Sequence, residues 1–265
     1  MITEIKNQNL VIISDLHLGN PFSNAKHPAV EFLNWASAQG YDVVINGDGF
    51  EIAQVSFTKI AREVPEVFRA MKQFSSRGRN LYYVIGNHDI VLENFLDDWG
   101  GFKMAPFLNV WSQNLRVRIE HGHLYDPFFV KNPELYEFLT WLGGFALKVH
   151  PSLYRSWIAF EKFKSKYIWK KSINGIMGEH SAFAEAANEL CQRGFDAVIF
   201  GHTHHAGEVE LKSGGRYFNS GSWLIGTPFI TVKDGQIFLS KWNPRTKSAF
   251  QGELPSSQSG NALSV

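Results

Sequence analysis

The sequence predicts an α/β fold built around a largely parallel β-sheet. Short runs of aliphatic and β-branched residues alternate with longer segments whose apolar residues recur at helical spacing. Each apolar run ends at a cluster of polar residues, and the ligands of open α/β sheets lie beyond the carboxyl ends of the strands. With 265 residues, 44% of them hydrophobic, the chain suits one globular domain with room for an insertion.

Five runs are expected to form strands, because continuous apolar runs of this length are typical of buried strands. The fourth run differs in that apolar and charged residues alternate along it. The runs span 10–13, 43–45, 81–85, 115–120 and 197–200, and the polar clusters after them are 14–17, 46–48, 86–89, 121–123 and 201–204.

Two segments between the first three runs are expected to form helices. The first spans Ala29 to Gln39 and the second spans Ile60 to Ser76, each with a glycine just beyond it. After the last polar cluster the pattern changes to short strands at 207–211, 216–219, 228–232 and 236–241, with Asp234-Gly235 as a hairpin turn.

Composition divides the chain into a core, an insertion and a tail. The core is expected at 1–130 and 185–250, and a helical insertion, or cap, at 131–184. Between residues 131 and 172 there are eight Lys and Arg against three Glu, an excess of five in a chain whose formal net charge is +1. The tail, 251–265, is rich in Ser, Gly, Gln and Asn and is expected to be disordered.

Cysteine content, apolar runs and net charge limit the compartment and the partners expected for this protein. The single cysteine, Cys191, excludes an intrachain disulfide and favours a reducing compartment, where it would be a small apolar residue of a helix. Neither a signal peptide nor a run of roughly 18 apolar residues is visible, so the cytoplasm is expected, with peripheral contact at the inner membrane left open. The near-zero net charge gives no reason to expect a nucleic-acid partner.

The polar clusters contain seven side chains that can bind metal ions. Carboxylate, amide oxygen and neutral imidazole together suit divalent ions such as Mn²⁺, Fe²⁺ or Zn²⁺. Seven ligands are too many for one ion, whereas two ions that share a carboxylate can activate water and neutralise a phosphoryl group. Each cluster alone could be an ordinary turn, but five in order favour a metal site with the ligands Asp15, His17, Asp48, Asn87, His121, His202 and His204.

These motifs resemble those of the calcineurin-like metallophosphoesterase superfamily, over residues 9 to about 243. The superfamily series is DxH, GDxx(D/E), GNH(D/E), HG and GHxH. Its counterparts here are Asp15-Leu16-His17, Gly47-Asp48-Gly49-Phe50-Glu51, Gly86-Asn87-His88-Asp89, His121-Gly122 and Gly201-His202-Thr203-His204. The resemblance implies a metallophosphoesterase fold, in which two mixed β-sheets form a sandwich flanked by helices.

The resemblance also implies a role for each motif residue. One metal would be held by Asp15, His17, Asp48 and His204, and the second by Asn87, His121 and His202, with Asp48 bridging. Mn²⁺ is the expected ion, with Fe or Zn as alternatives. His88 would be catalytic: it would face the substrate phosphate and donate a hydrogen bond or a proton. Asp89 would fix the tautomer of His88 and raise its pKa.

Within the superfamily, the sequences around the motifs resemble the UDP-2,3-diacylglucosamine pyrophosphatases of lipid A synthesis. The shared segments are 14–19, 47–51, 201–204 and 217–223, and the insertion lies at the same point. Two residues depart from this branch: His88 stands where many members have Arg, and His123 where the branch usually has Asp. The expected substrate is therefore a phosphate ester or sugar nucleotide, with the acylated UDP-sugar as the specific hypothesis.

The insertion is expected to select the substrate. Phe138, Trp141 and Leu142 would contact acyl chains, while Lys162 and Lys166 would supply positive charge. An alternative is that the aromatic residues pack the insertion onto the core and the lysines are solvated. Two other functions stay open: a general phosphodiesterase or nucleotidase acting on small soluble esters, and a non-catalytic metal-binding scaffold.

Overall fold

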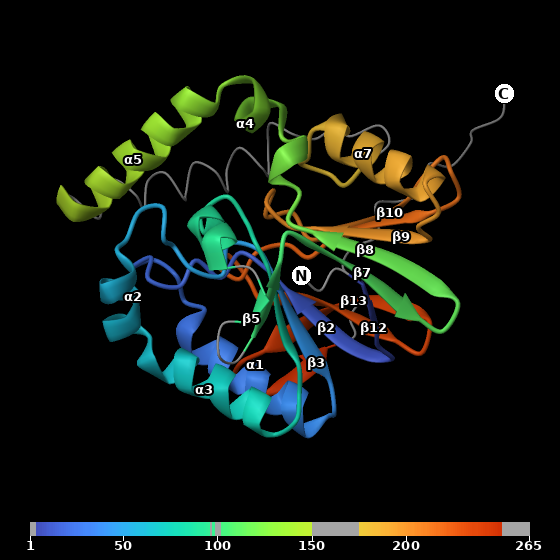
Figure 1. Cartoon of the computed structure of the whole chain (residues 1–265), viewed down its shortest axis with the longest axis horizontal. Helices are drawn as coiled ribbons and strands as arrows, with labels where there is room; N and C mark the ends of the chain where they lie inside the picture. Colours follow the sequence, from blue (N-terminus) through green and yellow to red (C-terminus); the bar gives the residue numbers. More distant parts are fainter. Residues whose placement is uncertain (1–3, 96, 99–101, 150–174, 251–265) are drawn as a thin grey trace, which may run out of the picture.

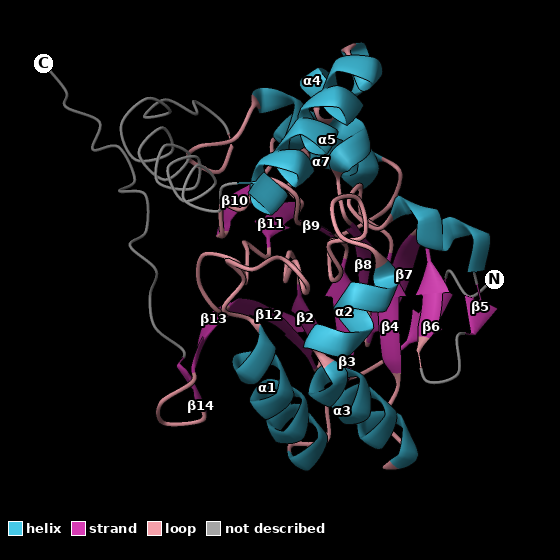
Figure 2. Cartoon of the chain, turned by 90° about the vertical axis from the view of Figure 1, so that its left-hand side faces the viewer, coloured by secondary structure: helices cyan, strands magenta, loops and turns pink. Residues whose placement is uncertain are grey.

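The computed structural model describes residues 4–95, 97–98, 102–149 and 175–250. Over these residues the chain forms two mixed β-sheets packed face to face, with helices on both outer faces (Figures 1 and 2). The expected fold class is confirmed. The expected tail, 251–265, and two of the expected substrate contacts, Lys162 and Lys166, lie outside the described residues.

The larger sheet carries the first three predicted strands side by side and parallel. Within the described chain it has eight strands, in the order β14 (Ser248–Phe250), β13 (Gln236–Asn243), β12 (Pro228–Lys233), β2 (Asn9–Ile13), β3 (Asp42–Asn46), β4 (Leu81–Val84), β6 (Lys103–Ala105) and β5 (Asp97–Asp98).

The smaller sheet carries the other two predicted strands, β8 and β9, which are also parallel neighbours. The described part of this sheet has six strands, in the order β1 (Glu4–Lys6), β7 (Phe107–Ser112), β8 (Leu115–Glu120), β9 (Ala197–Phe200), β11 (Arg216–Asn219) and β10 (Gly207–Glu210). All the strands expected from the sequence are therefore present, with small differences at their ends. The turn at Asp234-Gly235 joins β12 to β13, with φ of 48° and 77°.

The apolar runs are continuous because both faces of the larger sheet are covered. Along β2, Leu10 and Ile12 face the smaller sheet, while Val11 and Ile13 face the helices. Successive strand residues point to opposite faces, so a strand buried on both sides needs apolar residues at every position. The helices on this face are α1 (Lys26–Ala38) and α3 (Pro65–Ser76) (Figure 2).

The second predicted helix, Ile60 to Ser76, is wrong as a single element. The structure has two helices here, α2 (Phe57–Glu63) and α3, which meet at Val64. Pro65 has no N–H to donate and its ring restricts the residue before it, so Val64 leaves helical geometry with φ −127° and ψ 42°. Pro65 then begins α3, a position that tolerates proline.

The smaller sheet is covered by α7 (Ser181–Gln192). Phe183, Ala187 and Leu190 on α7 are buried against Val198 and Phe200 of β9. Cys191 lies on the same helix, is partly buried and forms no disulfide. Ile176, within the expected insertion, is buried in the same cluster.

A short helical segment leads out of the sandwich after β8. It consists of the turn η2 (His123–Tyr125), α4 (Pro127–Lys131) and α5 (Pro133–Val149). In Figure 1, α5 extends beyond both sheets. Phe138, Trp141 and Leu142 are exposed by 54%, 61% and 43%, and none of them belongs to the hydrophobic clusters of the described residues. None of the described helices is long and apolar enough to cross a membrane.

Candidate metal centre

The seven expected ligands all lie in loops that leave the strands at one edge of the sandwich. Asp15 and His17 follow β2, Asp48 follows β3, and Asn87 follows β4. The smaller sheet contributes the other three, His121 after β8 and His202 and His204 after β9. Parallel neighbours place their carboxyl ends together, which brings residues far apart in sequence to one point.

The backbone at these positions is unusual. Five of the expected ligands have positive φ, between 46° and 65°: Asp15, His17, Asp48, His202 and His204. Left-handed conformations are uncommon for residues other than glycine, although Asp and His adopt them more often than most. The loops thus turn sharply at the ligands, which directs their side chains toward one another.

Gly47 permits the closest approach between two of these loops. Its φ is +78°, and a Cβ atom placed on it would lie 2.2 Å from Nδ1 of His121. Any larger residue would displace the His121 ring from its place beside Asp48, so the glycine of the second motif is required by contact as well as by conformation.

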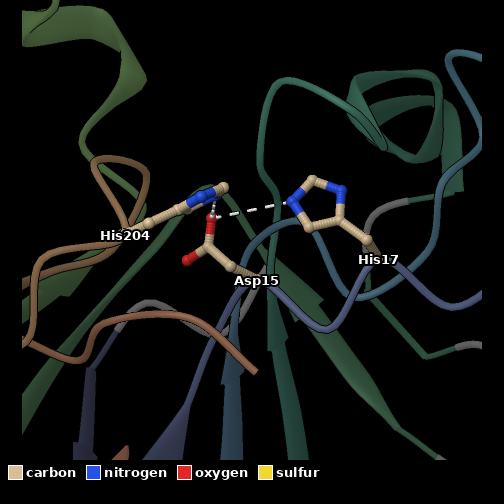
Figure 3. Close-up of side chains that lie close together, drawn as sticks. All are labelled: Asp15, His17 and His204. Carbon is tan, nitrogen blue, oxygen red and sulfur yellow. Dashed lines mark ion pairs between the residues drawn. The ribbon is translucent and has the colours of Figure 1, made fainter. Parts of the chain in front are cut away.

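One group of ligand atoms is formed by Asp15, His17 and His204. Figure 3 shows the carboxylate of Asp15 between the two rings, with Oδ1 3.1 Å from His204 Nε2 and 4.0 Å from His17 Nε2. His17 Nε2 also lies 3.9 Å from Asp48 Oδ2. Each of the three residues offers one ligand atom, and these atoms lie within 4.8 Å of one another.

A second group is formed around Asn87, His121 and His202. Asn87 Oδ1 lies 3.2 Å from His121 Nε2 and 2.9 Å from His202 Nδ1. Asp48 Oδ2 is 3.3 Å from His121 Nε2, so Asp48 adjoins this group as well as His17 of the first. The structure therefore brings all seven expected ligands together, with Asp48 between the two groups.

Three of the four histidines of the two groups are held at the nitrogen that faces away from the centre. Nδ1 of His17 is bonded to Glu51 (2.9 Å), Nδ1 of His121 to the carbonyl of Asn46 (2.9 Å), and Nε2 of His202 to Asp126 (3.0 Å). Donation at one nitrogen leaves the lone pair of the other for a metal, and such outer acceptors are usual for metal-binding histidines.

The unpartnered atoms of the centre also fit metal ions. His17 Nε2 is buried and has no hydrogen-bond partner. Burial without a partner costs about 1–3 kcal/mol for a neutral polar group, a cost that a bound cation would remove. The donor set of carboxylate, amide oxygen and imidazole is the one that borderline divalent ions prefer.

The acidic and histidine side chains at the centre shift one another's pKa values toward the charged forms. Burial alone would favour the neutral form of Asp48, but the neighbouring His121 and His88 hold the pKa of its carboxyl well below the usual value. Burial likewise opposes a charge on His121, yet Asp48 raises the pKa of this ring to about 9. Asp48 is thus a carboxylate in the metal-free chain, as an ion-binding residue must be.

The expected partner of His88 is wrong. His88 Nδ1 lies 2.5 Å from Oε1 of Glu51, and burial is outweighed by Glu51 and Asp48, which raise the pKa of His88 to about 10. Asp89 instead accepts hydrogen bonds from the Tyr83 hydroxyl and from the backbone N–H groups of Gly49 and Gly86. Asp89 faces these loops, and its charge is only a minor influence on His88.

The sequence interpretation gave no role at the centre to four residues that contact its ligands or the loops that carry them. Glu51 is the last residue of the second motif, and this position was the sequence signal that could have identified it. Asp126, bonded to His202, precedes a proline and resembles an ordinary helix cap. Tyr136 on α5 accepts a hydrogen bond from Asn87 Nδ2 (2.6 Å). Glu179, buried before α7, accepts hydrogen bonds from Thr203 Oγ1 and Asn219 Nδ2 and so supports the loop of His202 and His204.

His123, one of the two departures from the expected branch, is buried beside the second group. Its ring lies 5.6 Å from that of His121 and 6.4 Å from that of His202, between centroids. Burial and these two rings lower the pKa of His123 to about 3. His123 is therefore an uncharged side chain beside the second group of ligands.

A comparison with known families agrees with this geometry. The family model of calcineurin-like phosphoesterases matches residues 9–206, which include all seven expected ligands. The chain belongs to the calcineurin-like phosphoesterase family. It is accordingly a metal-dependent phosphoester hydrolase, from a family that works with two metal ions.

Relatives of this phosphoesterase include a UDP-2,3-diacylglucosamine hydrolase of Haemophilus ducreyi. The two are 25% identical over 205 residues, which cover 72% of this chain and 82% of the relative. Among solved structures, it is similar to Vacuolar Protein Sorting 29 of Cryptosporidium parvum (12% identity, 92% and 96% of the two chains, TM-score 0.48). It is also similar to a dimetal phosphatase of Danio rerio (10% identity, 88% and 95%, TM-score 0.47).

Proposed function

We propose that this phosphoesterase hydrolyses the pyrophosphate bond of UDP-2,3-diacylglucosamine, releasing UMP and diacylglucosamine 1-phosphate. The cofactors would be two divalent ions, with Mn²⁺ as the physiological choice. The identity shared with the Haemophilus ducreyi hydrolase supports the substrate class. The closeness of the centre to an exposed apolar helix supports an acylated substrate.

The seven ligands would hold the two ions, with Asp48 shared between them. Ions bound there would activate a water molecule and offset the negative charge of the diphosphate. The side chain of His88 is 16% exposed while its partner Glu51 is fully buried, so the ring reaches the surface of the centre from a fixed base. Burial lowers the pKa of His88, but the charge of Glu51, which is bonded to Nδ1, raises it, so a protonated His88 can donate from Nε2 to a phosphoryl oxygen.

The link between the centre and α5 supports acyl-chain recognition most directly. The Tyr136 hydroxyl accepts a hydrogen bond from Asn87, and Phe138, Trp141 and Leu142 follow it on the same helix with their side chains exposed. A diphosphate at the centre would therefore place attached chains along this helix. Each buried methylene contributes about 0.8 kcal/mol, so the length of the chains should affect binding strongly. Contact of this apolar surface with the inner membrane, on the cytoplasmic side, belongs to the same proposal.

The test compares two substrates in the Mn²⁺-loaded protein. The parent protein should release UMP from UDP-2,3-diacylglucosamine and should also hydrolyse bis-p-nitrophenyl phosphate. Trp141→Ala combined with Leu142→Ala should impair the first reaction and leave the second nearly unchanged, because the small ester does not reach α5. Phe238→Ala, an exposed aromatic on β13, is the matched control and should affect neither reaction.

Two results would count against the substrate assignment. Equal loss on both substrates would mean that Trp141 and Leu142 support the fold. Absence of UMP release by the parent protein, with turnover of the small ester intact, would leave a general phosphodiesterase or nucleotidase as the function.

A further inference from the structure

Within the described residues, two side chains of the segment from η2 to α5 form hydrogen bonds with ligands of the candidate metal centre, and both bonds fall on the same group of ligands. Asp126 Oδ2 lies 3.0 Å from His202 Nε2, and Asn87 Nδ2 donates to the Tyr136 hydroxyl over 2.6 Å. Asn87 and His202 both belong to the second group, which they form with His121. The first group is held differently: His17 is bonded to Glu51 in the core loops.

The carboxylate of Asp126 holds both the first turn of α4 and the ring of His202. Its Oδ1 accepts from the backbone N–H of Phe128 (2.8 Å) and so caps the first turn of α4. Its Oδ2 accepts from His202 Nε2, which leaves the lone pair of Nδ1 facing Asn87 Oδ1 at 2.9 Å. Two acceptor atoms at that distance repel unless a cation lies near both. The tautomer of His202 that Asp126 selects is therefore the one that binds a metal.

Tyr136 acts on the other ligand in the same way. An amide group has a donor end and an acceptor end. Because the Tyr136 hydroxyl accepts from the Asn87 nitrogen, the Asn87 oxygen is turned toward His121 and His202. Loss of the hydroxyl would leave the amide free to turn its nitrogen toward the metal position. The oxygen that can bind a cation is thus held in place from α5.

We infer that docking of α4–α5 and occupancy of the second metal position stabilise each other, with Asp126 and Tyr136 as positioning residues for His202 and Asn87. The inference rests on the ligand assignment of the proposed function, but not on its substrate. By thermodynamic linkage the coupling acts in both directions. A docked α4–α5 should tighten binding of the second ion, and the second ion should hold α4–α5 in place.

The first test measures Mn²⁺ binding alone by isothermal titration calorimetry. The parent protein should show two binding events. Asp126→Ser, which keeps a good helix cap but cannot also reach His202, should weaken one event by roughly 10–100-fold, as loss of an outer partner of a metal ligand usually does. Tyr136→Phe should weaken the same event, and the other event should change little in both variants.

Tyr125→Phe is the matched control. Its hydroxyl bonds to Glu120 over 2.7 Å, outside the ligand set, so both binding events should match the parent protein. Equal weakening of both events in Asp126→Ser and Tyr136→Phe, or no change in either event, would overturn the inference.

The second test needs no variant and therefore does not depend on their folding. Hydrogen exchange of the backbone amides in 127–149 should slow when the parent protein is loaded with Mn²⁺, and the slowing should track the second binding event. Unchanged exchange in these helices with both ions bound would overturn the coupling. Binding of a single ion by the parent protein would refute the ligand assignment itself, which the calorimetry detects without any substrate.

Discussion

Two histidine rings, those of His17 and His88, share the carboxylate of Glu51. Oε2 bonds to His17 over 2.9 Å and Oε1 to His88 over 2.5 Å, and the charge of Glu51 raises the pKa of both rings. One buried residue therefore orients an expected metal ligand and the expected catalytic group together. His88 also forms a third group with His17 and Asp48, whose ligand atoms lie within 4.8 Å of one another.

His88→Ala should lower kcat by roughly 10²–10⁴, the usual contribution of a positioned acid–base group. Because the seven expected ligands remain, the variant should still bind both ions. The measurement pairs kcat on bis-p-nitrophenyl phosphate with metal content after dialysis. A fall in metal content would show that His88 is a ligand.

Glu51→Gln and Asp89→Asn separate the two carboxylates near His88. In the metal-free protein, Glu51→Gln should lower the pKa of His88 from about 10, since Glu51 is the main group that raises it. Asp89→Asn should lower it much less. Both values can be followed by NMR titration of the imidazole ring.

Among secondary-structure features, those determined by neighbouring residues were easier to predict from the sequence than contacts between residues far apart. The strand from Leu10 to Ile13 and the turn at Asp234-Gly235 follow from neighbouring residues, and both were predicted correctly. The break before Pro65 was local too, but apolar spacing on both sides concealed it. The pairing of Asp126 with His202 joins positions 76 residues apart, so no local pattern reveals it.

The role of Glu179 could not be predicted from a local pattern either, because its hydrogen-bond partners come from β11 and the loop after β9. Burial raises the pKa of this carboxyl to about 8 from an ordinary 4.5, although hydroxyl and amide groups donate to it. The folded chain thus holds a proton that the unfolded chain has already lost, and unfolding releases it between about pH 4.5 and 8. In the metal-free protein the free energy of unfolding should therefore fall as pH rises through this range.

The contribution of Glu179 is about 1.4 kcal/mol for each unit of pKa shift. Urea unfolding of the metal-free protein at about pH 5 and about pH 8 measures the fall, and Glu179→Gln should reduce it. Glu185→Gln, an exposed residue of α7, is the control and should behave like the parent protein. An equal fall in the parent protein and in Glu179→Gln would exclude Glu179 as its source.

For the whole molecule, the ligands tie both sheets together at one edge. Asp15 follows β2 of the larger sheet and His204 follows β9 of the smaller one, and their side chains lie 3.1 Å apart. The unfolded chain has no such arrangement, so ions should bind mainly to the folded form. Binding at a free concentration 100 times Kd adds about 2.7 kcal/mol per site.

The melting temperature should accordingly rise with added Mn²⁺ and fall when a chelator removes it. In Asp48→Ala most of this rise should be lost and turnover abolished, because Asp48 is shared between the two groups. Differential scanning calorimetry at fixed protein concentration measures the shift. A full Mn²⁺-dependent rise in Asp48→Ala would contradict the shared carboxylate.

The left-handed backbone at Asp15, His17, Asp48, His202 and His204 has a consequence for how such a chain evolves. Each non-glycine residue held there carries about 1–3 kcal/mol of strain. The backbone at these five positions therefore lowers the free energy of unfolding of the metal-free protein. Glycine at any of the five positions would relieve the strain and remove a ligand in one substitution. A lineage selected for stability alone, or a thermostability screen without metal, would therefore lose the centre before the sandwich that carries it.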